Sequence, residues 1–224
     1  MNKDTLGVIL IGQSPRPDIV SQLRVVLGTE LKIEVRGALD GVPRSEIDTF
    51  TPEGSDDTLY TRLPGGEEAI ISKREVTKRA QAHIDHFADR GLDVILMFCT
   101  GAFKGLTPRG RMIFPSAVLT GVVEALVPRG RLGIFAPLPT QAEQVKSKWT
   151  QGQWEVVVEP LLPIDSTPEL ALAARRMANH RPDLIIMDCM GYTPPMKRRI
   201  QEITGTRAVL AVTTAARMVQ ELMT

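Results

Sequence analysis

The sequence predicts an α/β protein built of two pseudo-symmetric, doubly wound lobes, with mostly parallel sheets and a cleft between the lobes. Short β-branched apolar runs alternate with segments of helical periodicity almost throughout, which is typical of parallel strands covered on both faces by helices. DVILMFCTG at 93–101 is echoed by DLIIMDCMG at 183–191, and LGVI at 6–9 is echoed by LGIF at 132–135. With 224 residues, 43% of them hydrophobic, the chain can bury a core in each lobe.

The expected strands are apolar runs that stop at a turn signal. In chain order they are 6–11, 31–36, 68–71, 93–98, 131–136, 155–159, 183–188 and 207–211.

The expected helices lie between these runs. In chain order they are 17–27, 73–90, 116–126, 140–149, 168–179, 194–203 and 213–222. Ser72 is a suitable cap for the helix that begins at Lys73, and Gly91 follows the last turn of the same helix. Thr167 and Pro168 give a second helix the cap and first-turn proline that a helix start favours.

The two echoes divide the chain into lobes. Residues 1–112 together with 206–224 are expected to form the first lobe, and residues 113–205 the second. The crossover is placed in the Pro/Gly-rich stretch 105–116, and the final helix is expected to pack back on the first lobe. The polar stretch 37–67 is read as a long loop, and loops of that length are often functional or mobile.

Charge and composition exclude several classes of function. The 27 basic and 26 acidic residues leave a net charge of +1, so no global field favours nucleic acid or acidic lipid. No apolar run approaches the roughly 20 residues of a membrane span, and no secretory signal opens the sequence. We therefore expect a cytoplasmic protein with no nucleic-acid or membrane partner, whose two cysteines remain thiols.

Cys99 and Cys189 are the candidate catalytic residues. Each follows an apolar run and precedes a glycine by two residues, and ligands of open parallel sheets bind at such strand ends. Two thiols on opposite faces of one carbon can remove a proton from one face and return a proton to the other, without a metal or an organic cofactor. The alternative is simple packing, because free cysteine is among the most buried residue types.

The candidate substrate-binding residues surround these strand ends. They are Gln13, Ser14, Arg16, Arg74, Thr100, Gly101, Gly191 and Tyr192. Arg16 could bind a carboxylate with both prongs of its guanidinium, and Arg74 could face the cleft, but either is also compatible with a solvated helix start. Tyr192 could close over a ligand with its hydroxyl or pack beside the turn.

Several other kinds of site are not indicated. His83 and His86 are three residues apart on an expected helix but have no convincing third ligand, so no metal site is predicted. The sequence has no G-x-G-x-x-G fingerprint, phosphate-binding P-loop or G-x-S-x-G elbow. We therefore predict no cofactor.

The chain resembles the AroM family, which is related to the aspartate/glutamate racemase superfamily. The resemblance is carried by 12–18 (GQSPRPD), 52–54 (PEG), 56–63, 72–74 (SKR) and both cysteine segments, notably 184–192. It implies two α/β lobes with a cleft between them and a cofactor-independent mechanism. Its relatives racemise amino acids or hydantoins, isomerise maleate or decarboxylate arylmalonates.

The chain departs from the amino-acid racemases around both thiols. Those enzymes usually follow the first cysteine with Asn-Thr and the second with Thr-His, whereas Cys99 is followed by Thr100-Gly101 and Cys189 by Met190-Gly191. We therefore expect a racemase, isomerase or related lyase acting on another small carboxylate-bearing molecule. The alternative is a binding or regulatory protein of the same fold that does not turn its ligand over. The oligomeric state is left open, with a homodimer as one option.

Overall fold

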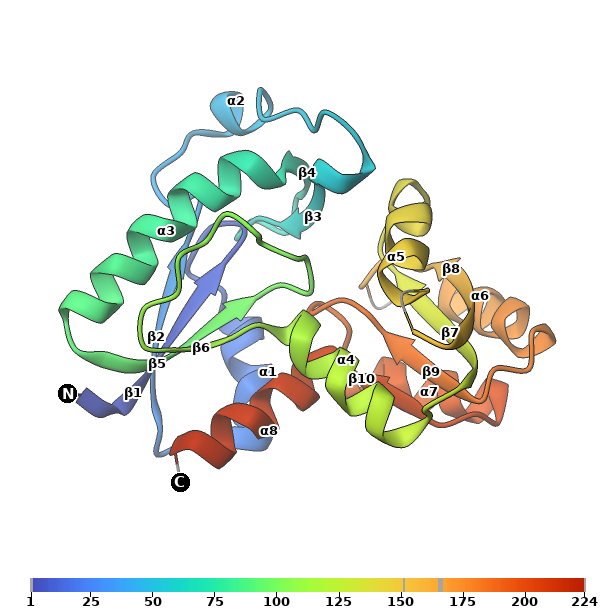
Figure 1. The fold of residues 1–224 in the computed structure, drawn as a ribbon. Helices are drawn as coiled ribbons and strands as arrows, with labels where there is room; N and C mark the ends of the chain where they lie inside the picture. Colours follow the sequence, from blue (N-terminus) through green and yellow to red (C-terminus); the bar gives the residue numbers. More distant parts are fainter. Residues whose placement is uncertain (1, 151, 165–166, 224) are drawn as a thin grey trace. The chain divides into compact units, whose positions relative to one another are not determined.

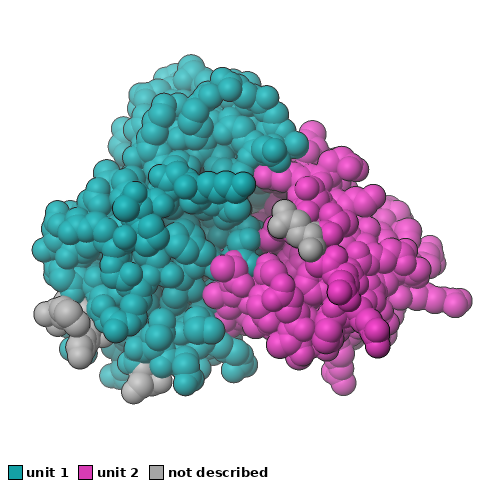
Figure 2. All heavy atoms as spheres, in the orientation of Figure 1, with its two compact units in different colours: residues 1–116, 215–224 teal, residues 117–214 magenta. Residues whose placement is uncertain are grey.

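The computed structural model describes residues 2–150, 152–164 and 167–223. The chain forms two compact units, Met1–Ser116 with Ala215–Thr224 and Ala117–Thr214 (Figure 2). Residues 1 and 224, which the sequence assigns to the first lobe, lie outside the described residues. Each unit is described by itself below.

Unit 1 contains a parallel sheet in the strand order β2-β1-β5-β6 (Figure 1). Its strands are β1 (Asn2–Leu10), β2 (Lys32–Gly37), β5 (Leu92–Phe98) and β6 (Arg111–Ile113). The helices of this part of the chain are α1 (Pro17–Leu27), α2 (Arg44–Ile47), the short 3-10 turn η1 (Ser55–Asp57), α3 (Lys73–Asp89) and the C-terminal α8 (Ala211–Met223). Gln220 of α8 donates a hydrogen bond to the carbonyl of Val26 (3.0 Å), so the end of the chain contacts α1.

Unit 2 contains a second parallel sheet, in the order β10-β9-β7-β8. Its strands are β7 (Gly130–Ala136), β8 (Trp154–Pro160), β9 (Leu184–Met187) and β10 (Ala208–Leu210). Its helical segments are α4 (Pro115–Leu126), which begins in unit 1, the 3-10 turn η2 (Pro139–Gln141), α5 (Ala142–Trp149), α6 (Thr167–Asn179) and α7 (Pro194–Thr204).

The two sheets repeat one topology. In each, the first strand lies between the next strand of the chain and the strand that precedes a cysteine, and one further parallel strand pairs with the latter. The register repeats as well, because Gly7 pairs with Ile95 and Gly133 with Ile185, the positions that the two sequence echoes align. The predicted α/β class with parallel sheets is confirmed.

The two units differ in their connections. β9 leads to β10 through α7, whereas β5 leads to β6 through a segment with no helix. Unit 1 also contains an antiparallel hairpin of β3 (Thr58–Arg62) and β4 (Glu68–Ser72). The sequence predicted β4 as a strand but not β3 or β6, because runs of three to five residues in polar or Pro/Gly-rich surroundings show no clear period.

The boundary between the units differs from the expected one. The sequence assigned residues 206–224 to the first lobe, but β10 pairs with β9 and so belongs to the sheet of unit 2. The chain returns to unit 1 at Ala215, inside α8. The expected strand at 207–211 therefore exists, in the other sheet.

No helix in the described part of the chain has the length and apolar character needed to cross a membrane.

Candidate functional site

Cys99 lies at the carboxyl end of β5, in the turn that leaves the sheet of unit 1. Its sulfur accepts a hydrogen bond from the backbone N–H of Gly101 (3.3 Å). The thiol is half-buried and packs against the edge of the hydrophobic core of this unit. A Cβ at Gly101 would lie 3.3 Å from Leu59 and 3.4 Å from the sulfur, so glycine keeps this side of the thiol uncovered.

Cys189 occupies the equivalent turn after β9. Its sulfur accepts a hydrogen bond from the N–H of Gly191 (3.4 Å), and the thiol is again half-buried. A Cβ at Gly191 would meet Pro163 at 3.0 Å and the sulfur at 3.6 Å. Each unit therefore presents a thiol in the same local geometry, at the strand end where ligands of parallel sheets bind.

The residue before each thiol is where the two turns differ most. Phe98 precedes Cys99 and is buried, whereas the equivalent Asp188 is a buried carboxylate. Asp188 accepts hydrogen bonds from Lys148 (2.8 and 3.1 Å) and from the indole N–H of Trp149 (2.8 Å). Sequence analysis did not select Asp188 or Lys148. The available signal was Asp188 itself, a charged residue at the position where the other copy of the motif has the apolar Phe98.

Gln13 and Ser14 follow β1 at the same edge of the sheet as Cys99, because Leu10 pairs with Phe98. The side-chain amide of Gln13 donates to the carbonyls of Leu39 (3.1 Å) and Val42 (2.8 Å). These contacts fasten the loop after β1 to the segment that follows β2.

Asp40, in the segment that follows β2, is a further residue that sequence analysis did not select. Its carboxylate accepts hydrogen bonds from the Ser14 N–H (2.6 Å), the Ser14 hydroxyl (2.7 Å) and the Gly37 N–H (2.8 Å). A Cβ at Gly37 would lie 2.6 Å from this carboxylate. Asp40 therefore shapes the loop that carries two of the predicted substrate-binding residues.

Arg16 is only slightly exposed and is held within its own unit. Its guanidinium donates to the Asp18 carboxylate (2.8 and 2.6 Å) and to the carbonyl of Arg62 at the end of β3 (2.5 Å). The hydrogen bond from Arg16 is the main reason that the pKa of Asp18 lies below its ordinary value.

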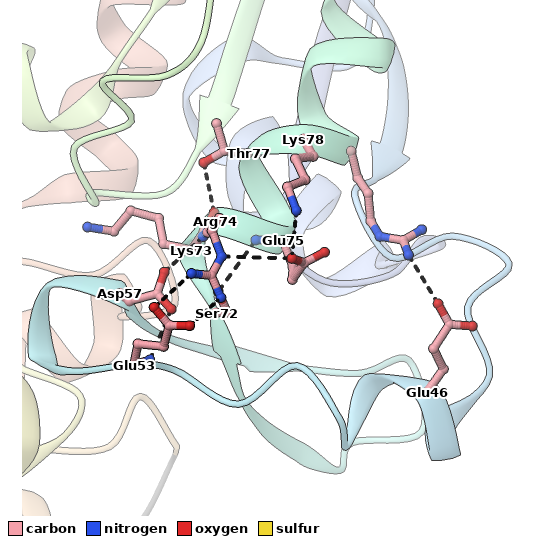
Figure 3. A network of polar contacts seen from close by, with 10 residues as sticks. Glu46, Glu53, Asp57, Ser72, Lys73, Arg74, Glu75, Thr77 and Lys78 are labelled. Atoms are coloured by element: carbon pink, nitrogen blue, oxygen red, sulfur yellow. Dashed lines mark hydrogen bonds and ion pairs between the residues drawn. The ribbon is translucent and has the colours of Figure 1, made fainter.

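Arg74 lies in the first turn of α3 (Figure 3). Its guanidinium makes a two-pronged pair with Glu53 (2.8 and 2.9 Å), and its backbone N–H donates to Asp57 (2.9 Å). The side chains of the pair are 50% and 71% exposed, which fits the solvated helix-start reading better than a carboxylate-binding role. Ser72 is the helix cap, as predicted, and accepts from the N–H of Glu75 (3.5 Å).

Tyr192 corrects one detail of the sequence-based prediction. Its side chain is fully buried, and its hydroxyl donates to the carbonyl of Leu161 (2.5 Å). The structure therefore supports the packing alternative rather than a hydroxyl that closes over a ligand.

Thr100 is half-buried beside Cys99.

His83 is half-buried on α3, with Nε2 2.9 Å from the carbonyl oxygen of Gly37. Burial lowers the pKa of His83 below its ordinary value, and the contact with Gly37 acts in the opposite direction. His86, one turn along, faces Glu34 at 4.0 Å. Within the described ranges, no three His, Cys, Asp or Glu side chains are grouped so as to hold a metal ion.

Comparison with known proteins gives a family match and a set of structural neighbours. A family model described as AroM protein matches residues 6–223. The chain matches none of the curated proteins compared with it.

The solved structures that resemble it share its fold at low sequence identity. The maleate isomerase Iso from Pseudomonas putida S16 is 11% identical with a TM-score of 0.64, over 97% of this chain and 92% of that one. A crystal structure of arylmalonate decarboxylase is 14% identical with a TM-score of 0.62, over 98% and 92%. The Picrophilus torridus aspartate racemase is 11% identical with a TM-score of 0.58, over 98% and 94%. These similarities show an aspartate/glutamate racemase-like fold.

Proposed function

Because the chain belongs to the AroM family, we propose that it is a cofactor-independent racemase, isomerase or related lyase acting on a small carboxylate-bearing molecule. Cys99 and Cys189 are the acid/base pair. The observation that carries the proposal is the repeated turn, in which each sulfur accepts the N–H of the glycine two residues later. The structural neighbours, whose names describe a decarboxylase, racemases and an isomerase, support the same range of chemistry.

The proposed reaction begins with one thiolate and one thiol. The thiolate sulfur takes a proton from the substrate carbon beside the carboxyl group, and the electron pair of the broken C–H bond is delocalised into that group. The other thiol then gives its proton to the opposite face of the same carbon. The two sulfurs have exchanged protonation states, and the configuration is inverted. For a malonate-like substrate the C–C bond breaks instead, CO₂ leaves, and a thiol protonates the carbon that keeps the electron pair.

The proposal assigns substrate contacts to the groups near each thiol. In unit 1 these are Gln13, Ser14 and Thr100, together with the backbone of Gly101. In unit 2 the backbone of Gly191 has the equivalent position. Glycine allows a ligand to approach the main chain closely, and backbone N–H groups are suitable donors to a carboxylate.

The test is incorporation of solvent deuterium at the reacting carbon, with aspartate and an arylmalonate as the first substrates. We expect Cys99→Ser and Cys189→Ser each to lower turnover and exchange by about 10²- to 10⁴-fold, the usual contribution of a positioned acid or base. Each variant should unfold at the wild-type temperature, because the exchange of sulfur for oxygen is nearly isosteric. Wild-type exchange rates in both variants would remove the thiols from the mechanism.

The competing assignment is a binding or regulatory protein that does not turn its ligand over. Alkylation with iodoacetamide separates the two assignments. A catalytic pair contains one cysteine that reacts readily near neutral pH and is protected by substrate. Two thiols that react like free peptide cysteine, with no turnover of any substrate tested, would favour the binding protein.

A further inference from the structure

The repeat between the two units provides an internal comparison for the residues around each thiol. Phe98 and Asp188 occupy the same position of the echoed motif, one residue before Cys99 and Cys189; Phe98 is the last residue of β5, and Asp188 directly follows β9. Phe98 shows that an apolar side chain satisfies this position of the fold. A buried carboxylate at the equivalent position of unit 2 therefore needs a separate explanation.

The carboxylate of Asp188 is buried, and both of its oxygens accept hydrogen bonds. Its side chain is 2% exposed, and both of its oxygens contact the Lys148 ammonium (3.1 and 2.8 Å). Trp149, itself buried, donates its indole N–H to the same carboxylate (2.8 Å). The backbone N–H of Asp188 donates to Phe135 in the neighbouring strand (3.0 Å).

The ion pair of Asp188 and Lys148 is not explained by a gain in stability of the fold. Removing a carboxylate and an ammonium from water opposes folding, and apolar side chains of similar volume often stabilise a protein as well or better. Lys148 is only partly buried, with its side chain 21% exposed, and its ammonium lies 5.1 Å from the ring centroid of Trp149. The ion pair therefore fixes a charged group at the residue that precedes Cys189, whereas the apolar Phe98 precedes Cys99.

We propose that Asp188, held by Lys148 and Trp149, is a positioning residue that sets the protonation of Cys189 separately from that of Cys99. This inference rests on the proposed function, because a two-thiol mechanism needs one thiol and one thiolate at rest. Because Asp188 adjoins Cys189 in the chain, its negative charge disfavours the thiolate, whereas the ammonium of Lys148 that pairs with it favours the thiolate. Asp188 and Lys148 thus act in opposite directions on the same sulfur, and two turns of similar backbone geometry are made chemically different.

The experiment measures the rate of Cys189 alkylation by iodoacetamide at about pH 7, in a Cys99→Ser background and without substrate. Asp188→Asn removes the negative charge that precedes Cys189 and keeps the ammonium, so it should raise the rate about three- to tenfold, whereas Lys148→Met should lower it by a similar factor. The double variant should return close to the starting rate. The same substitutions in a Cys189→Ser background should leave the alkylation rate of Cys99 within about twofold.

The two substitutions are expected to change the alkylation rate in opposite directions, and this distinguishes an electrostatic role from a structural one. Loosening of the turn exposes the sulfur in both variants and moves both rates in the same direction, and that result would overturn the proposal. So would changes smaller than about twofold in both. Lys148→Met leaves a buried carboxylate without its cation and can fail to fold. The test then compares the alkylation rates of Asp188→Asn and of the double variant, because loss of Lys148 must slow alkylation in the Asp188→Asn protein too.

The readout needs no substrate, so the two proposals fail separately. Opposite shifts in a protein that turns over no substrate would support the role of Asp188 and count against catalysis. Deuterium exchange that depends on both thiols, with no effect of Asp188 or Lys148 on alkylation, would give the reverse result.

Discussion

At the scale of single residues, two glycines explain how a helix packs on each central strand. A Cβ at Gly7 would lie 2.9 Å from the ring of Phe87 in α3, and a Cβ at Gly133 would lie 2.4 Å from the sulfur of Met177 in α6. Both of these helix side chains are fully buried. At each glycine, the helix residue fills the space that a side chain would otherwise occupy. The core is closely packed, so there is no room for both.

Gly133→Ala is therefore expected to lower the free energy of unfolding by about 1–3 kcal/mol, the usual cost of overpacking a core. Met177 must move, and Pro182, whose ring atoms would lie 3.1 Å from the new Cβ, limits where it can go. Urea denaturation measures the change.

Gly121→Ala is the matched control. Gly121 is exposed within α4 and has nothing within 4 Å of an added Cβ. Alanine there should raise stability by up to about 1 kcal/mol through helix propensity. Equal effects of the two substitutions would contradict the packing argument.

At the scale of elements, the start of α3 shows which polar contacts hold a helix in place. Asp57, in η1, accepts the N–H of Arg74, one of the N-terminal donors that have no partner within the helix. Burial raises the pKa of Asp57, but hydrogen bonds from Ser72 and from the N–H groups of Arg74 and Glu53 outweigh it, so the pKa lies below its ordinary value. The exposed pair of Arg74 and Glu53 lies beside this contact (Figure 3).

We expect Asp57→Ala to lower stability by about 1 kcal/mol, the usual cost of losing an acceptor at a helix start. Glu53→Ala should lower stability less than Asp57→Ala does, since exposed ion pairs contribute little and are screened by salt. Thermal denaturation at low and high salt compares the two variants. A larger loss for Glu53→Ala would show that the ion pair, rather than the helix-start contact, fixes the loop.

At the scale of the whole molecule, stability should depend on pH through His83. Burial holds its pKa below the ordinary value of 6.5, so the unfolded chain binds this proton more readily than the folded protein. The free energy of unfolding therefore rises with pH between the two pKa values. As the pH falls through about 6.5, the protein loses stability, and the loss ends below the pKa of the folded state.

His83→Gln should flatten the dependence of unfolding free energy on pH between about pH 7 and pH 5, as measured by urea denaturation across that range. An NMR titration of the His83 ring in the folded protein is the independent check. A ring that titrates above 6.5, or an unchanged slope in the variant, would rule out this source of pH dependence.

Much of this architecture was predictable because it repeats along the chain. The echoed cysteine segments end strands at matching positions, and the two glycine-containing echoes pair with them in one register. Strands buried on both faces must be apolar along their length, so period and composition reveal them locally. The strand-end positions of Cys99 and Cys189 follow from the same pattern.

What only the tertiary structure decided depends on contacts between segments distant in the sequence. The hairpin partner β3, the short strand β6 and the membership of β10 in the second sheet are set by pairing, which no local period records. The contacts of Asp40 with Ser14, of Tyr192 with Leu161 and of Lys148 with Asp188 likewise join residues 26, 31 and 40 positions apart. The sequence alone determined that each thiol follows the end of a strand, because the end of an apolar run is a local feature of the sequence. The charges and hydrogen bonds around them were decided by the fold, because only folding brings those groups within reach.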